Sequence, residues 1–142
     1  MGHVAGSEID GRTIAYDLSL EGMLSQKKDF IGKRSLSKTA YIAPDRQKIV
    51  GVVPIDKKTS IPEGSYLVKD AKAKLPNPKL GHVSASCWSV EYDNPFSLAI
   101  IKDGKNKKGE NLFAVSPLKN KIIPVEIVSQ HYVDPEGKRV RS

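Results

Sequence analysis

The chain has 142 residues, of which 39% are apolar and 27% are charged, and its mean hydropathy is -0.37. This composition is typical of a soluble globular protein and excludes a collagen-like fibre or a disordered chain. The 23 lysine and arginine residues outnumber the 16 acidic residues, and the net charge of +7 favours an anionic partner such as nucleic acid, a phosphate or a polycarboxylate.

Two features of the sequence indicate its compartment and the source of its stability. No apolar run approaches the roughly 18 residues of a membrane span, and the N-terminus lacks the apolar run of a secretory signal, so we expect a cytoplasmic protein with no membrane partner. The lone Cys87 excludes an internal disulfide and a cysteine-based zinc site. We expect Cys87 to be a small buried apolar side chain, within a protein that depends on a hydrophobic core.

The expected elements divide the chain near residue 45. The first forty residues are polar and contain one candidate helix, Asp29–Leu36, which Asp29 can cap. From Gln47 onward, six short apolar or alternating runs are separated by proline and glycine turn signals, which predicts a compact antiparallel barrel or sandwich. The candidate strands are Lys48–Val53, Ser65–Lys69, Gly81–Ser86, Phe96–Lys102, Asn111–Val115 and Lys121–Val128.

Details of these runs predict their places in the sheet. Leu98–Ile101 is apolar on both faces and is expected to be central, whereas the alternating Ser65–Lys69 is expected nearer an edge. Pro124 predicts a bulge or an edge in the last strand. The segment Lys102–Lys108 is typical of a lysine-rich hairpin tip, which would be either a solvated loop or a phosphate-contacting loop.

Known catalytic and nucleotide-binding motifs are missing from the sequence, and its three histidines lie far apart. His82 falls within a strand pattern and is expected to be a packed or edge residue, with ligand binding as the alternative. Glu8, Asp10 and Asp17 could together bind a cation or an amine; alternatively, Asp10 belongs to a turn and Asp17 caps a following segment. The basic end of the chain, residues 134–142, would suit a carboxylate ligand or be a frayed terminus.

An ordered set of short strings resembles the folate-binding T-protein family of the glycine cleavage system. The most recognisable string is Asp29-Phe-Ile-Gly32. The other matching strings are Gly6–Thr13, Asp17–Leu20, Ile49–Val52, Pro62–Gly64, Leu80–Ser86, Ser97–Ala99, Lys108–Glu110 and Tyr132–Gly137. The strings span nearly the whole chain, so the resemblance rests on the set and on its order.

Within that superfamily, the chain is most similar to the C-terminal end of the alpha subunits of heterotetrameric, tetrahydrofolate-dependent sarcosine oxidases. The strings that carry this closer resemblance are Lys27–Leu36, Asp45-Arg46, Gly81–Ser89 and Asp134–Arg139. The resemblance implies a mainly β fold, a six-stranded antiparallel Greek-key-like barrel preceded by a short segment that contains α-helix. It also implies that residues 1–44 are the incomplete tail of a folate-binding domain and that residues 45–142 form the T-protein-like barrel domain.

The resemblance implies a role in the folate half of sarcosine oxidation, whose products are glycine, methylene-tetrahydrofolate and hydrogen peroxide. The complete subunit would bind tetrahydrofolate, and the complete complex would use FAD, FMN and NAD, which this chain is not expected to bind alone. The implied partners are the remainder of the alpha subunit and the beta, gamma and delta subunits.

The family's folate-activating aspartate corresponds to a position upstream of residue 1, so the resemblance implies that this chain does not catalyse one-carbon transfer alone. No catalytic or metal-binding residue is therefore assigned within it. The positions that match folate-side motifs are Glu8, Asp10, Arg139 and Arg141, and one of the two arginines is expected to pair with a ligand carboxylate.

Two other functions are consistent with the residues. The chain could be a free-standing scaffold or interaction module, for which an exposed apolar patch around Ile14, Leu18, Leu20, Met23 and Leu24 would be suited. A barrel that binds single-stranded nucleic acid is disfavoured because only Trp88 and Tyr66 could supply stacking rings.

Overall fold

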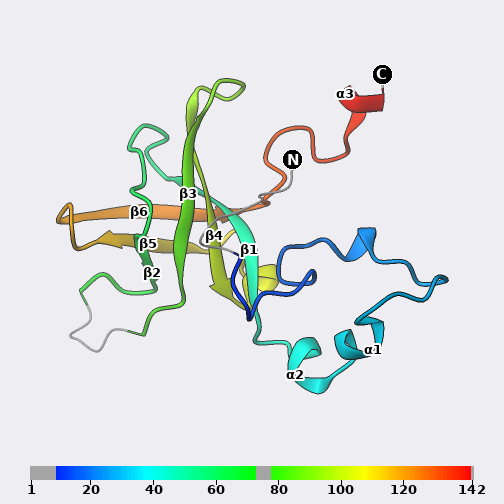
Figure 1. Cartoon of the computed structure of the whole chain (residues 1–142). Coiled ribbons are helices and arrows are strands. Elements are labelled where there is room, and N and C mark those ends of the chain that lie inside the picture. Colours follow the sequence, from blue (N-terminus) through cyan, green and yellow to red (C-terminus); the bar gives the residue numbers. More distant parts are fainter. Residues whose placement is uncertain (1–8, 73–77, 142) are drawn as a thin grey trace.

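The computed structural model describes residues 9–72 and 78–141, and its main feature is a barrel of six strands (Figure 1). The strands are β1 (Gln47–Pro54), β2 (Tyr66–Val68), β3 (Gly81–Ser89), β4 (Asn94–Lys102), β5 (Asn111–Ser116) and β6 (Lys121–Val128). The short helices are η1 (Glu21–Met23), α1 (Lys33–Leu36), α2 (Thr39–Ile42), η2 (Gly104–Lys107) and α3 (Lys138–Arg141).

The strands close on themselves in the order β1-β4-β3-β2-β5-β6, and every neighbouring pair is antiparallel. Closure removes the sheet edges at which unpaired backbone groups would otherwise be exposed. The expectation of a six-stranded antiparallel barrel, preceded by a segment with short helices, is therefore confirmed.

The barrel interior is filled by aliphatic side chains from all six strands and from the loop between β1 and β2. Alternation is clearest in β6, where Ile123, Val125 and Ile127 point inward and Glu126 is exposed, as the period of two requires. The core side chains are Val50, Val52, Ile61, Leu67, Val83, Ala99, Ile101, Leu112, Ala114, Ile123, Val125 and Ile127.

Two glycines permit close approach between strands. A Cβ on Gly81 would lie 2.7 Å from the Cα of Ile101 and would overlap the carbonyl oxygen of Ile100. A Cβ on Gly51 would lie 2.7 Å from the ring of Phe96. The pairing of β3 with β4, and the packing of Phe96 on β1, therefore require these positions to have no side chain.

The structure corrects three details of the predicted sheet. The segment Lys102–Lys108 is not a hairpin tip, because it joins β4 to β5, which are not neighbours, and it contains η2 packed on β1. β2 is not at an edge, since it pairs with both β3 and β5. Local turn signals identify where strands end, but strand partners are decided by contacts distant in sequence, which explains both differences.

Pro124 causes neither a bulge nor an edge. It pairs with Phe113 in an uninterrupted register, and its carbonyl oxygen accepts a hydrogen bond of 3.0 Å from the backbone N–H of Ile55. Ile55 follows the last residue of β1, so Pro124 lies opposite the end of that strand. The backbone N–H that proline lacks is therefore not needed for a strand hydrogen bond there.

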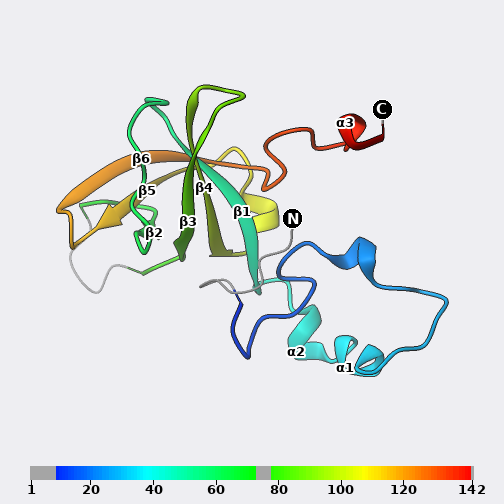
Figure 2. The same ribbon diagram turned by 45° about the horizontal axis from the view of Figure 1, so that its top comes forward.

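Residues 18–45, here called the N-terminal arm, extend away from the barrel in both views (Figures 1 and 2). The predicted helix Asp29–Leu36 is only partly correct, because α1 begins at Lys33. Gly32, at φ +91°, is its N-cap, and Asp29 instead accepts a hydrogen bond from the N–H of the adjacent Phe30. Left-handed backbone at Gly32 stops the helix from extending back to Asp29.

Candidate functional site

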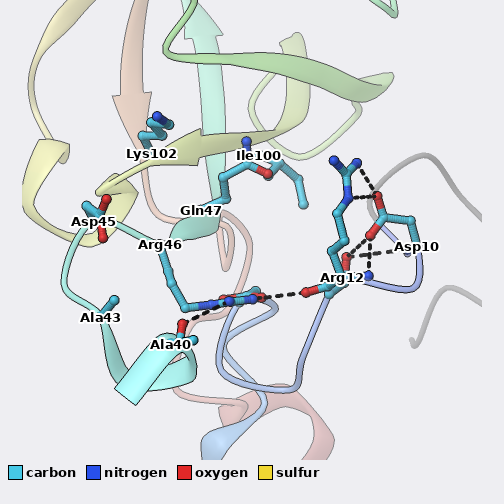
Figure 3. A pocket seen from close by; sticks show the side chains of 11 residues that line it. Asp10, Arg12, Ala40, Ala43, Asp45, Arg46, Gln47, Ile100 and Lys102 are labelled. Carbon is cyan, nitrogen blue, oxygen red and sulfur yellow. Dashed lines mark hydrogen bonds and ion pairs between the residues drawn. The ribbon is translucent and has the colours of Figure 1, made fainter. Parts of the chain in front are cut away.

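A polar pocket lies where the N-terminal arm meets the barrel (Figure 3). Its volume is about 330 Å³. The lining residues are Asp10, Arg12, Thr13, Asp17, Ala40, Ala43, Asp45, Arg46, Gln47, Ile100 and Lys102. Ile100 and Lys102 come from β4, and the other residues come from the chain before the barrel and from the first residue of β1.

A buried ion pair between Asp17 and Arg46 holds the two ends of the arm together. Asp17 is only 3% exposed, and its Oδ1 accepts a 2.9 Å hydrogen bond from Nε of Arg46. Nη2 of Arg46 also donates to Oδ2 of Asp17, so the guanidinium contacts both carboxylate oxygens. This paired geometry is the strongest arrangement open to an arginine and a carboxylate.

Further bonds satisfy the rest of this pair. Oδ2 of Asp17 accepts from the N–H of Ile14 at 3.1 Å, and the carbonyl oxygen of Asp17 accepts from the N–H of Ile49 at 2.7 Å. Arg46 donates to the carbonyl oxygens of Arg12 and Ala40 at 3.0 and 3.2 Å. The hydrogen bond to Asp17 raises the pKa of Arg46. Because these bonds satisfy both charges, the pair serves to fix the backbone.

Asp17 therefore caps the turn that precedes it and does not cap a following segment. Sequence analysis missed the partner of Asp17, since Arg46 lies 29 positions later. In the sequence, Arg46 stands out only because the Asp45-Arg46 string contributes to the family resemblance. No local signal links residues that far apart in an irregular segment.

Asp10 has its own partner at the mouth of the pocket. Its Oδ2 accepts bonds of 3.0 and 2.5 Å from Nε and Nη2 of Arg12, and its Oδ1 accepts a 2.8 Å bond from the N–H of Arg12. These bonds, the side-chain bond above all, lower the pKa of Asp10 to about 2. A carboxylate with so low a pKa is a weak general base at neutral pH.

The pocket as a whole has balanced charge. Its ionisable lining residues are Asp10, Asp17 and Asp45 against Arg12, Arg46 and Lys102. No histidine or cysteine lines it, and the part of the chain that the structure describes contains no group of three potential metal ligands. The arrangement can hold polar groups of both signs.

The predicted residue Arg139 lies in α3, which both views place away from the loop that carries Asp10 (Figures 1 and 2). Its Nη1 and Nη2 donate to the two carboxylate oxygens of Glu91 at 3.1 and 2.5 Å. This bonding lowers the pKa of Glu91 and raises that of Arg139. Both side chains are substantially exposed, so solvent weakens the pair.

An aromatic cluster holds the segment before α3 on the β3–β4 hairpin. The ring of Tyr132 stacks on Phe96 with centroids 4.8 Å apart and is tilted against Tyr92 at 4.7 Å. Asn94 donates from Nδ2 to the hydroxyl of Tyr132 at 3.1 Å. Together with the Glu91–Arg139 pair, these contacts position the basic end of the chain.

The structure describes three of the four predicted folate-side residues, and these three lie on two segments, with Asp10 before the barrel and Arg139 and Arg141 in α3. Glu8 lies outside the described residues, and the dark blue segment at the start of the described chain lies away from α3 in both views (Figures 1 and 2). Arg141 is exposed and makes no ion pair within residues 9–72 and 78–141. The chain thus carries two separate charged regions, one at the base of the arm and one in the C-terminal tail.

The structure also bears on Cys87 and on the two rings considered for nucleic-acid stacking. Cys87 is exposed, not buried, because β3 extends past the barrel into the β3–β4 hairpin. Trp88 beside it is 51% exposed. Tyr66 pairs with His82, which is six positions from Trp88 along β3, or roughly 20 Å at the rise of a strand. The two rings therefore cannot form one stacking surface for nucleic acid.

The comparison with solved structures identifies the fold. The structure matches the crystal structure of the glycine cleavage system aminomethyltransferase T from Bartonella henselae with a TM-score of 0.66 and 18% sequence identity. The match covers 86% of this chain and 32% of that chain. The protein therefore has the fold of part of an aminomethyltransferase, whereas no protein-family model matches the sequence.

Curated sequences give the closer relationship. The chain is 36% identical over 141 residues to the sarcosine oxidase subunit alpha of Rhizobium meliloti (strain 1021), and this match covers 98% of the chain. It is 35% and 33% identical to the alpha subunits of Corynebacterium sp. strains U-96 and P-1, over 96% of the chain. The chain spans 14% of the length of each relative. It is thus homologous to one segment of sarcosine oxidase alpha subunits, as its motifs indicated.

Proposed function

We propose that this chain is the C-terminal barrel portion of a sarcosine oxidase alpha subunit-like protein and contributes to tetrahydrofolate-dependent one-carbon transfer. The observation that carries the proposal is the similarity to three such subunits along at least 96% of the chain. The aminomethyltransferase fold supports it, because proteins of that name transfer one-carbon groups. The reaction would convert sarcosine to glycine, methylene-tetrahydrofolate and hydrogen peroxide in a larger assembly, and this chain would not catalyse it alone.

The tail arginines are the residues of this chain that suit an anionic ligand. Arg139 already directs two N–H donors at the two oxygens of one carboxylate, and this is the arrangement that a folate carboxylate needs. A folate carboxylate would have to replace Glu91 as the partner of Arg139. Because both side chains are substantially exposed, breaking the Glu91–Arg139 pair costs little free energy. Bound tetrahydrofolate supplies the nitrogens that accept the one-carbon unit.

The N-terminal charges have a different role in this proposal. Asp10 keeps its loop in place through Arg12, and the buried Asp17–Arg46 pair joins that loop to the barrel. Glu8, which lies outside the described residues, belongs to the same folate-side motif in this proposal. FAD, FMN and NAD would bind in the complete complex and not to this chain alone. The remainder of the alpha subunit and the beta, gamma and delta subunits are the partners that the proposal requires.

Titration calorimetry tests the proposal. Tetrahydrofolate would be added to the chain alone and then to the chain mixed with the Rhizobium meliloti alpha polypeptide that lacks the matched segment. We expect no binding to the chain alone and binding to the mixture. A free-standing scaffold would instead bind the alpha polypeptide without affecting its affinity for tetrahydrofolate.

Variants of Arg139 and Arg141 test whether the C-terminal tail holds a folate carboxylate. In the mixture, Arg139→Ala and Arg141→Ala are expected to weaken tetrahydrofolate binding, with at least one of them costing about tenfold or more because a charge-assisted pair is lost. Lys119→Ala, an exposed cation on the β5–β6 turn, is the matched control. Unchanged affinity in both arginine variants would contradict the assignment of a carboxylate site to the tail.

A further inference from the structure

The N-terminal arm, residues 18–45, contributes nothing to the hydrophobic core of the barrel. None of its residues is buried, and its only regular elements are η1, α1 and α2, each of three or four residues. A cavity of about 580 Å³ lies among its own turns, lined by Leu24, Phe30 and Ile42 together with polar residues. Isolated helices this short are unstable, so the arm gains little stability from its own contacts.

The arm exposes large apolar side chains. Ile31 is fully exposed, Met23 is 80% exposed, and Ile42 is 62% exposed. Within the patch expected around Ile14 and Leu24, Leu20 and Met23 are exposed, whereas the other three side chains are partly covered. Several such residues on one short segment indicate a surface that another molecule covers.

The middle of the arm is strongly basic. Between Gly22 and Ile42 it has five lysine or arginine residues and one aspartate, a net charge of +4, and with Glu21 and Asp45 the whole arm has a net charge of +2. Lys33 donates to the backbone carbonyl oxygens of Gln26 and Lys28. Within the described residues, no carboxylate pairs with the other four cations, which are Lys27, Lys28, Arg34 and Lys38. An acidic surface would complement this charge.

The base of the arm is fixed even though its middle projects. The arm begins after Asp17 and ends before Arg46, and the buried pair formed by these two residues closes it. Both views show the arm extending to one side of the barrel, away from the β5–β6 turn (Figures 1 and 2). Because the base of the arm is fixed, the arm points in one direction before a partner binds. Less conformational entropy is therefore lost on docking.

We infer that the N-terminal arm is a docking element for an acidic protein surface with apolar sockets, which receive Ile31 and Met23. The inference rests on the proposed function, because it assigns this surface to the polypeptide that corresponds to the rest of the longer alpha subunits. A membrane surface fits less well. Lipid-surface segments are continuous amphipathic helices, whereas these apolar residues lie on separate turns of an irregular backbone.

Binding of the intact chain to the Rhizobium meliloti alpha polypeptide without its matched segment tests the inference. Two arm variants are compared with wild type, Ile31→Ser and the double change Lys27→Glu with Lys28→Glu. Each is expected to raise the dissociation constant about tenfold or more, since it removes an apolar anchor or reverses charge. Wild-type binding should also weaken as salt is raised, because exposed charges are screened.

The β5–β6 turn offers matched controls. Leu118 is fully exposed, like Ile31, and the exposed Lys119 and Lys121 resemble the lysine pair of the arm. Leu118→Ser and the double change Lys119→Glu with Lys121→Glu should leave the dissociation constant within twofold of wild type. Amide hydrogen exchange should slow in residues 18–45 on binding and stay unchanged in the β5–β6 turn.

Three results would overturn the inference. Equal binding by wild type and both arm variants would exclude the arm while leaving the proposed function intact. If the wild-type chain did not bind the alpha polypeptide, both the inference about the arm and the proposed function would be excluded. Binding to vesicles of phosphatidylserine and phosphatidylcholine could also be measured. If the Ile31 and Lys27 changes weakened vesicle binding more than binding to the alpha polypeptide, the arm would be assigned to a lipid surface.

Discussion

At the scale of single residues, the most consequential contact joins Asp17 to Arg46. Asp17 is buried and Arg46 is mostly covered, and the pair is bonded through both carboxylate oxygens and supplemented by backbone groups on each side. The Asp10–Arg12 pair in the same pocket has similar chemistry, but its arginine side chain is 92% exposed. Burial is therefore the main difference between the two pairs, and it predicts different energies.

A double-mutant cycle measures this difference. Arg46→Met should lower the free energy of unfolding by about 3 kcal/mol, because it leaves the buried Asp17 carboxylate without its counter-charge. Asp17→Asn should cost less, because the Arg46 side chain is partly exposed. The double variant should lose much less than the sum of the two. Arg12→Ala, the exposed control, should cost much less than either change in the Asp17–Arg46 pair, because solvent screens an exposed ion pair. Urea unfolding followed by circular dichroism gives the values, and an equal loss from Arg12→Ala would contradict this account.

Two carboxylates predict how stability changes in acid. The pKa of Asp56 is lowered to about 2, chiefly by the hydroxyl and then the N–H of Thr59, and that of Asp10 is also lowered to about 2. Since the ordinary value is 3.8, the folded state favours the ionised forms. Their stabilising contribution is therefore complete above about pH 4 and is lost as pH falls toward 2.

Carbon-detected NMR titration checks this prediction. The side-chain carboxyl resonances of Asp56 and Asp10 should have midpoints near pH 2 in the folded chain. Thr59→Val should move the midpoint of Asp56 upward and leave that of Asp10 in place. A midpoint near pH 4 for both wild-type residues would show that neither set of hydrogen bonds persists in solution.

At the scale of elements, strand positions were predictable and strand partners were not. Alternation in Lys121–Val128 gave β6 with its bounds, because an inward apolar residue at every second position is a local property. Lys102–Lys108 had the local features of a hairpin tip, yet it connects strands on different parts of the barrel. Cys87 had apolar character, but its exposure follows from how far β3 continues beyond the core.

The site was less predictable than the fold, for the same reason. Asp10 and Arg139 were found through motifs, but their partners Arg12 and Glu91 depend on the folded backbone. The Asp17–Arg46 pair had no local signal. Charged residues in irregular segments lack the periodicity that identifies strands, so their contacts become evident only in three dimensions.

Gly81 provides the prediction at this scale. Gly81→Ala should lower the free energy of unfolding by about 3 kcal/mol, since the new Cβ would overlap the backbone of Ile100 and Ile101 in the neighbouring strand. Gly22→Ala, where nothing lies within 4 Å, should leave stability within about 0.5 kcal/mol of wild type. Thermal unfolding of both variants gives the comparison, and similar melting temperatures would argue against the close β3–β4 pairing.

At the scale of the whole molecule, a closed barrel carries two extensions of different kinds. The C-terminal tail is attached through aromatic packing on the β3–β4 hairpin, and the N-terminal arm is attached through a buried ion pair at its base. None of the helices in the described residues is long and apolar enough to cross a membrane. The division into residues 1–44 and 45–142 stays a prediction.

The central claim is that this barrel is a working part of a larger folate-dependent oxidase. The most direct measurement is methylene-tetrahydrofolate formation from sarcosine by the Rhizobium meliloti beta, gamma and delta subunits with the alpha polypeptide that lacks the matched segment. This account predicts product when the chain is added and little or none without it. The same yield with and without the chain would contradict the claim.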